Sequence, residues 1–234
     1  MTRGDRFEVI GFDADDTLWR SEDFFGAAER LFVELVAPHA PAGIDVLGAL
    51  HATETDNIAV SGYGVKAFAL SMVQAAVTAT AGRVPASVIG ALVDHAHEML
   101  MHPVELLPGV PEALAAAGST HRLVLITKGD LVHQTRKVRT SGLEHHFEHI
   151  EVVLDKQVAT YRRVLDEWGV DPASFLMVGN SVRSDILPVL ELGGHGVHVP
   201  YHVTWDHELV VDHDGDFAEL ASIAELADWL ATAD

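Results

Sequence analysis

The sequence predicts an α/β fold in which a doubly wound parallel sheet carries an inserted, all-helical subdomain. Short apolar runs recur along the chain, and most of them end directly before a polar residue. Helical patterns separate the later runs, whereas about 100 residues of mostly helical character separate the first two. Strands that alternate with helices predict a parallel sheet with helices on both of its faces.

Five apolar runs are the predicted strands. Short, nearly continuous apolar runs are typical of strands that are buried on both faces. The runs are VIGF (9–12), LVLI (123–126), EVVL (151–154), FLMV (175–178) and, after two glycines, GVHVP (196–200).

The helices that accompany these strands are predicted from apolar residues at helical spacing. In the stretch 157–168, for example, Val158, Tyr161, Val164, Leu165 and Trp168 fall close to one face of a helix. The expected helices are 111–117, 129–141, 157–168, 185–192 and 222–231.

The chain between the first two strands is too long for a simple crossover. A complete strand–helix–strand unit takes only about 30 residues, and here the excess contains Ala-rich or amphipathic patterns at 24–36, 44–59, 66–81 and 85–101. We therefore predict that residues 20–102 form an inserted helical subdomain. Residues 1–19 and 103–234 then form the α/β core.

Composition narrows the classes of function. The 234 residues are 48% hydrophobic, which suits one domain with an insert, and there is no cysteine for a disulfide. The net charge of −20 argues against nucleic acid or an anionic membrane as partner. No apolar run reaches about 18 residues, so no membrane span is expected. A cytoplasmic protein fits these features, as either a monomer or a homodimer.

Four of the predicted strands are followed by polar residues that could do chemistry. Asp13 follows the first, Thr127 the second, Lys156 closely follows the third, and Asn180 closely follows the fourth. Taken singly, each could be a helix cap or a turn residue. In an open parallel sheet, however, ligands bind beyond the carboxyl ends of the strands. Four such residues at equivalent positions predict a single site.

These stretches resemble the motifs of the haloacid dehalogenase (HAD) superfamily. FDADDTL resembles the first motif, DxDx[TV], and LVLITKGD resembles the second, a strand that ends in Thr or Ser. Lys156 after EVVLD matches the lysine of the third motif, and LMVGNSVRSDI resembles the fourth, GDxxxxD. The resemblance implies a Rossmann-like core, with the helical insertion in the position of a C1-type cap.

The resemblance also implies phosphoryl transfer through an aspartyl-phosphate. Asp13 would be the nucleophile, and Asp15 would be the general acid and base, with its proton favoured by negative neighbours. Thr127 would hydrogen-bond a phosphoryl oxygen, and Lys156 would neutralise charge on Asp13 and the transferring group. We expect Asp16 to serve the turn rather than the reaction.

Magnesium is the implied cofactor. Its ligands would be the Asp13 carboxylate, the Asp15 backbone carbonyl, and Asn180 or Asp185. Asn180 stands where the superfamily more often has Asp, so we expect weaker metal binding. Lys128 stands where the superfamily commonly has Asn, and it would add a cation near the phosphate.

Further residues are candidates for contact with a substrate, which we expect to be a small phosphorylated metabolite. Thr127, Lys128 and Gly129 would contact the phosphate. Tyr63, between two glycines in SGYGVKAF, and Lys66 would reach the site from the insertion, which would act as a lid. The stretch HVPYHVTWDH (198–207) is expected to border the site.

The function that these residues predict is a magnesium-dependent phosphatase acting on a phosphate monoester. Asp15 favours it, because the dehalogenases of the superfamily need neither an acid at this position nor a metal. A phosphomutase is an alternative. Phosphonate cleavage through a Schiff base on Lys66, the only lysine of the insertion, is another. Asn180 is the one hint of a catalytically weak binding or regulatory protein.

Overall fold

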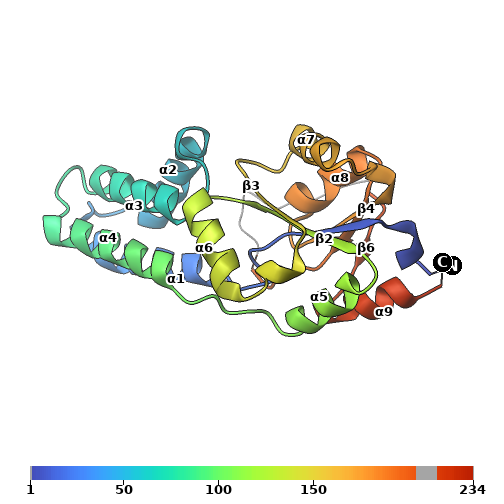
Figure 1. Cartoon of the computed structure of the whole chain (residues 1–234). Helices are drawn as coiled ribbons and strands as arrows, with labels where there is room; N and C mark the ends of the chain where they lie inside the picture. The colour runs from blue at the N-terminus through green and yellow to red at the C-terminus, as the bar shows by residue number, and fades with distance from the viewer. Residues whose placement is uncertain (1, 204–214, 234) are drawn as a thin grey trace. The chain divides into compact units, whose positions relative to one another are not determined.

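The computed structural model describes residues 2–203 and 215–233, and the chain divides into two compact units. One unit comprises Met1–Glu22 and Val104–Asp234, and the other comprises Asp23–Pro103. The borders predicted from the sequence, at 19/20 and 102/103, lie within three residues of these. Figure 1 shows the sheet in the first unit and the inserted helices in the second.

The first unit is built on a parallel six-stranded sheet with the order β3-β2-β1-β4-β5-β6. The predicted fold class is thereby confirmed. The strands are β1 (Val9–Phe12), β2 (Arg122–Lys128), β3 (His149–Val153), β4 (Phe175–Gly179), β5 (His195–His198) and β6 (Ala218–Glu219).

Two strands differ from the sequence-based expectation. Strand β3 begins earlier than predicted and ends before Leu154, whose residue surface is 87% exposed. Strand β6 was not predicted, because two residues are too few to show a hydrophobic pattern.

The position of β1 explains where a site can form. β1 pairs with β2 on one side and with β4 on the other, so the chain winds outward in opposite directions from it. In register, Ile10 lies between Leu123 and Leu176. This is the topological switch point of the sheet, where ligands of doubly wound folds bind beyond the strand ends. Asp13 follows β1 directly.

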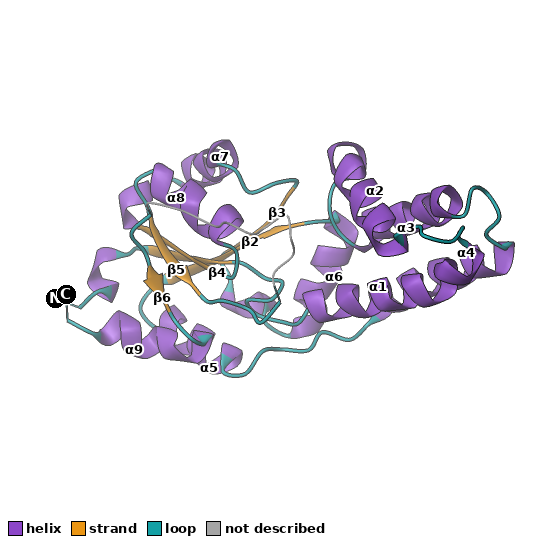
Figure 2. Ribbon diagram, turned by 180° about the vertical axis from the view of Figure 1, so that it is seen from behind, coloured by secondary structure: helices purple, strands orange, loops and turns teal. Residues whose placement is uncertain are grey.

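Alternate strand residues face opposite sides of the sheet, and each side is covered by helices (Figure 2). Ile10, Phe12 and Leu125 belong to one buried cluster, whereas Val9, Val124 and Ile126 belong to another. The helices of this unit are α5 (Val110–Gly118), α6 (Leu131–Ser141), α7 (Val158–Trp168), α8 (Leu187–Glu191) and α9 (Leu226–Ala231). Residues of α5, α6 and α9 join the first cluster, and residues of α7 and α8 join the second.

The predicted helix at 185–192 is less regular than expected. A π-helical turn at Val182–Ile186 precedes the short helix α8, and the Ser181 hydroxyl accepts a hydrogen bond from the Ser184 N–H. π-Helical turns are uncommon and occur frequently at functional sites. This one carries Asp185.

The second unit is entirely helical in its secondary structure. Helix α1 (Glu22–Val36) leads into it, and α2 (Val46–Ser61), α3 (Val65–Ala79) and α4 (Ala86–Met101) follow. Phe32, Leu50, Phe68, Met72 and Leu92 lie in its own buried cluster. The insertion therefore has its own hydrophobic core, separate from the two that flank the sheet.

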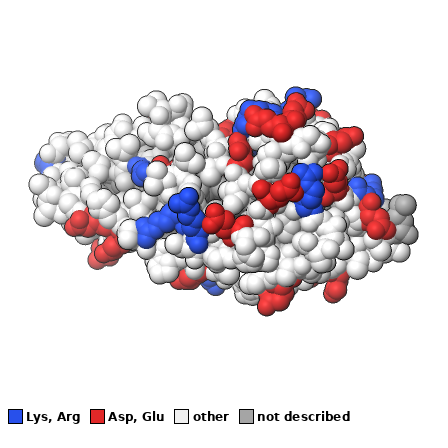
Figure 3. Space-filling model, viewed as in Figure 1, with Lys and Arg blue, Asp and Glu red and all other residues white. Residues whose placement is uncertain are grey.

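Many surface charges are paired. Arg163 contacts Glu151 and Glu167, for example, at 2.8 and 3.0 Å. On the face drawn in Figure 3, the basic side chains form small patches, most with acidic side chains beside them. Within the described residues, no helix is long and apolar enough to cross a membrane.

Candidate active site

The segment after β1 folds into a turn that presents Asp13 at the carboxyl edge of the sheet. The Asp13 N–H donates to the Val178 carbonyl at 2.9 Å, which continues the β1–β4 pairing by one residue. The Thr17 hydroxyl lies 3.1 Å from Asp13 Oδ2 and accepts a hydrogen bond from the Asn180 N–H at 3.0 Å. Thr17 therefore links the first and fourth motifs, besides bracing the turn.

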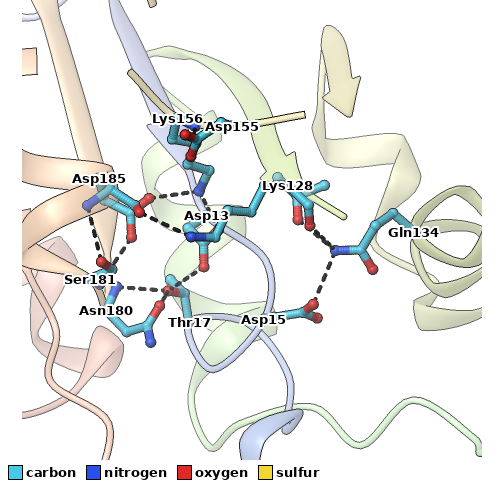
Figure 4. A network of polar contacts seen from close by, with 12 residues as sticks. Asp13, Asp15, Thr17, Lys128, Gln134, Asp155, Lys156, Asn180, Ser181 and Asp185 are labelled. Atoms are coloured by element: carbon cyan, nitrogen blue, oxygen red, sulfur yellow. Dashed lines mark hydrogen bonds and ion pairs between the residues drawn. The ribbon is translucent and has the colours of Figure 1, made fainter. Parts of the chain in front are cut away.

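Lys156 lies between two carboxylates in the buried part of the site (Figure 4). Its ammonium group donates to Asp13 Oδ1 and, at 2.6 Å, to Asp185 Oδ1. The Lys156 and Asp185 side chains are each only 1% exposed. Burial lowers the pKa of Lys156, but the two adjacent carboxylates outweigh it and raise the pKa overall. The lysine is therefore a fixed positive charge.

For Asp13, the effect of burial on the pKa outweighs that of the neighbouring lysine. Burial raises its pKa to about 7; Lys156 opposes that rise and Asp185 adds to it. The contact with Lys156 favours the ionised carboxylate that a nucleophile requires.

Asp185 positions Lys156 and the turn after β4. Its Oδ2 accepts a hydrogen bond from the Ser181 N–H at 3.0 Å, while its Oδ1 binds Lys156. Gly179 makes room for this arrangement, because a Cβ at that position would overlap the Asp185 carboxylate. The Gly–Asn dipeptide of the fourth motif thus has a steric reason for its glycine.

Asp15 is held by residues that the sequence analysis did not single out. Lys137 Nζ contacts its two carboxylate oxygens at 2.5 and 2.7 Å, and Gln134 Nε2 donates to Oδ2 at 3.0 Å. Trp19 Nε1 donates to Oδ1 at 2.5 Å. Gln134 and Lys137 both lie on α6, three residues apart and thus on one face of the helix. Their signal in the sequence is weak, because polar helical residues usually face solvent.

These contacts correct the expected state of Asp15. Burial alone would raise its pKa, but the Lys137 ammonium and the hydrogen bonds from Lys137, Trp19 and Gln134 lower it overall. The prediction that negative neighbours hold a proton on Asp15 is therefore wrong for this arrangement. The carboxylate is ionised at neutral pH and remains accessible, with 30% of its side chain exposed.

Asp16 serves the turn, as expected. It has a positive φ of 61°, and its carboxylate accepts hydrogen bonds from the N–H groups of Ser21 and Glu22 at the start of α1. Burial and the nearby Asp15 raise its pKa to about 7. All three acids of the first motif thus have different partners.

The end of β2 brings Thr127 and Lys128 to the same edge. The Thr127 hydroxyl accepts a hydrogen bond from Gln134 Nε2 at 2.7 Å, and Lys128 Nζ donates to Ser184 Oγ at 3.1 Å. Figure 4 shows the Lys128 side chain extending toward Asp13. Gly129, with a φ of 132°, donates its N–H to the Val153 carbonyl and joins the ends of β2 and β3.

Three oxygen-bearing groups converge where the sequence predicts a metal. One atom of the Asn180 side-chain amide lies 3.2 Å from the Asp15 carbonyl oxygen and 3.2 Å from Asp13 Oδ2. If this atom is nitrogen, it donates to both oxygens; if it is oxygen, the three oxygens need a cation between them. Oxygens bound side by side to Mg²⁺ at about 2.1 Å lie about 3 Å apart. The donor types and spacing therefore fit magnesium.

Of these three groups, only Asp13 contributes a side-chain carboxylate. The two carboxylate oxygens of Asp185 accept hydrogen bonds from Lys156 and from the Ser181 N–H. Accordingly, the described residues include no group of three or more His, Cys, Asp or Glu side chains arranged to hold a metal ion.

The remaining candidates are two residues of the insertion and the stretch that follows β5. Tyr63 is half-buried between α2 and α3, where Gly62 and Gly64 both have positive φ, and Lys66 is exposed in the first turn of α3. Both belong to the helical unit. Of the stretch 198–207, residues 204–207 lie outside the described residues, while His198 Nε2 contacts the Asn180 carbonyl at 3.0 Å.

Known proteins share this architecture. A haloacid dehalogenase-like family hydrolase from Xanthomonas campestris is 39% identical, with a TM-score of 0.86 over 95% of this chain and 90% of that one. The HAD-hydrolase YfnB from Bacillus subtilis, bound to magnesium, is 17% identical, with a TM-score of 0.67 over 96% and 99%. A 2-haloacid dehalogenase from Pseudomonas syringae is 21% identical, with a TM-score of 0.63 over 96% and 98%.

The last two similarities are below 25% identity and establish the fold alone. No curated protein matches the chain by sequence. Residues 7–193 match the sequence profile of the haloacid dehalogenase-like hydrolases, and this range contains all four motifs. The insertion between β1 and β2 agrees with a C1-type cap. The protein is therefore a haloacid dehalogenase-like hydrolase.

Proposed function

We propose that this hydrolase is a magnesium-dependent phosphatase that cleaves a small phosphate monoester through an aspartyl-phosphate on Asp13. The observation that carries the proposal is the Asp15 carboxylate, two residues after Asp13 and bound by Lys137, Gln134 and Trp19. Release of an alkoxide from phosphorus requires a proton donor. Release of a halide does not, so a dehalogenase would have no use for this acid.

In the proposed reaction, the Asp13 carboxylate attacks phosphorus and the ester oxygen leaves with a proton from Asp15. Asp15 then takes a proton from the water that hydrolyses the aspartyl-phosphate. The ionised state of Asp15 suits this second step. For the first step, the phosphate dianion would bring negative charge near Asp15 and raise its pKa.

The surrounding residues would bind and orient the phosphoryl group. Thr127 would donate its hydroxyl to a phosphoryl oxygen, while Lys156 and Lys128 would balance negative charge. Asp13, the Asp15 carbonyl and Asn180 would hold Mg²⁺, which supplies charge neutralisation of the phosphoryl group when it is bound. Asp185 would act mainly through Lys156.

The test is a screen for phosphate release from phosphorylated metabolites, with magnesium and with EDTA. Chloride release from 2-chloropropionate is measured in parallel. We expect magnesium-dependent phosphate release and no chloride. Asp13→Asn should abolish turnover while leaving the circular dichroism spectrum and thermal unfolding close to those of the wild type.

Three results would count against the proposal. Chloride release without phosphate release would make the protein a dehalogenase. Tight, magnesium-dependent binding of beryllium fluoride without any turnover would favour the binding or regulatory alternative. Isomerised sugar phosphate in place of free phosphate would identify a phosphomutase.

A further inference from the structure

Beyond the four motifs, helix α6 brings two side chains to Asp15. Lys137 contacts both carboxylate oxygens, and Gln134 contacts Oδ2. Trp19 Nε1, four residues after Asp15, donates to Oδ1. The carboxylate thus receives four donor contacts, three of them from a helix that begins more than 100 residues later.

The same helix also binds the second motif. Asp130 caps the start of α6 by accepting a hydrogen bond from the His133 N–H at 2.8 Å. One turn further on, Gln134 Nε2 reaches the Thr127 hydroxyl at 2.7 Å and the Lys128 carbonyl at 3.0 Å. Gln134 is only 2% exposed. Its single amide group therefore sets Asp15 and Thr127 relative to each other.

Each of the two acids is paired with its own lysine. Asp13 is paired with Lys156, which comes from the end of β3, and Asp15 is paired with Lys137, which comes from α6. The side chain of Lys137 is 13% exposed and that of Asp15 is 30% exposed, so this pair is partly buried. A partly buried ion pair adds little to stability, because the loss of hydration offsets much of the attraction between the charges. Its position beside the predicted acid and base indicates a role in the reaction.

We propose that Lys137 and Gln134 are positioning residues, which hold the Asp15 carboxylate in the orientation needed for proton transfer to the leaving group. This inference rests on the proposed phosphatase function. It adds that two residues outside the recognised motifs determine how well the acid works. Loss of Lys137 should therefore lower activity most on substrates whose leaving group must be protonated as it departs.

The first experiment compares an alkyl phosphate with p-nitrophenyl phosphate, whose leaving group is a stable anion. The quantity is kcat/KM, because it reports the steps through formation of the aspartyl-phosphate and omits its later hydrolysis. Lys137→Met should lower kcat/KM for the alkyl ester about tenfold or more relative to the aryl ester. Asp15→Asn should give the same selective loss, and a larger one.

Two further variants and one control separate the effect of charge from that of packing. Lys137→Arg retains the positive charge and should restore part of the activity on the alkyl ester. Gln134→Met should lower kcat/KM for both esters, because it also releases Thr127, with the larger loss on the alkyl ester. Arg139→Met removes an exposed positive charge from the same helix and should leave the ratio of the two esters unchanged.

Equal losses on both esters for Lys137→Met would overturn the inference, since they would indicate a general structural defect. A second measurement does not depend on activity. Thermal unfolding of Lys137→Met, Asp15→Asn and the double variant forms a double-mutant cycle. We expect the double variant to unfold at a higher temperature than the two single losses predict by addition.

The two proposals fail in different ways. If the wild type hydrolyses neither ester nor any metabolite of the screen, the phosphatase proposal fails. The cycle then decides whether Lys137 holds Asp15: coupling between the two substitutions supports it, and additive losses overturn it.

Discussion

The two edges of the parallel sheet use the same kind of ion pair in opposite environments. At the amino edge, Arg122 contacts Glu8 and Glu148 at 2.8 and 2.7 Å, with the side chains 33%, 56% and 45% exposed. At the carboxyl edge, Lys156 contacts Asp13 and Asp185 with at most 9% of any side chain exposed.

Distances are similar at the two edges, but the energetic consequences differ. Exposed pairs contribute about 0–1 kcal/mol because water and salt screen them. Breaking a buried pair leaves an uncompensated charge and costs about 3–5 kcal/mol. Burial, rather than contact geometry, distinguishes the edge that carries the candidate site from the opposite edge.

The largest expected effect is that of Lys156→Met. This substitution keeps the approximate volume but leaves Asp13 and Asp185 buried without their cation, so the free energy of unfolding should fall by about 3–5 kcal/mol. Urea unfolding followed by circular dichroism measures it. A loss below 1 kcal/mol would mean that the two edges do not differ as described.

A smaller loss is expected for Asp185→Asn. The amide oxygen can still accept from the Ser181 N–H, but the charged half of the contact with Lys156 is lost. We expect a loss of about 1–3 kcal/mol in the free energy of unfolding, measured in the same way. If the loss equalled that of Lys156→Met, Asp185 rather than the lysine would be the centre of the cluster.

Asn180→Asp tests whether the carboxyl edge of the sheet binds magnesium, which the amino edge is not expected to do. A carboxylate at this position, beside Asp13 Oδ2 and the Asp15 carbonyl, should strengthen binding of Mg²⁺ by about tenfold, or about 1.4 kcal/mol. Calorimetric titration of the protein with magnesium alone measures the affinity. In EDTA, the added negative charge should lower the temperature of unfolding, and magnesium should reverse that loss. Unchanged affinity would show that Asn180 is not a ligand.

The smallest effect is expected at the amino edge. Arg122→Met removes both exposed pairs and should lower the free energy of unfolding by about 1 kcal/mol or less. The wild-type protein should lose most of that difference in 1 M NaCl, where the screening length falls to about 3 Å. Urea unfolding at low and high salt tests this. A loss as large as that of Lys156→Met would contradict the role given to burial.

The sheet, the insertion and the grouping of the candidate site residues could be predicted from the sequence. Continuous apolar runs indicated buried parallel strands, and parallel strands end at one edge, so Asp13, Thr127, Lys156 and Asn180 had to meet there. The resemblance in four short motifs identified the family and supplied the roles that we propose for these residues. Such inferences succeed because strand direction and burial are encoded in local patterns.

The surroundings of each carboxylate could not be predicted from the sequence, because they depend on tertiary packing. Lys137 and Gln134 are ordinary polar residues in the helical pattern, and only the tertiary packing of α6 brings them to Asp15. Their proximity reversed the expected shift in the pKa of Asp15. Charge interactions fall with distance in space rather than in sequence, so local patterns cannot assign the partner of a buried charge.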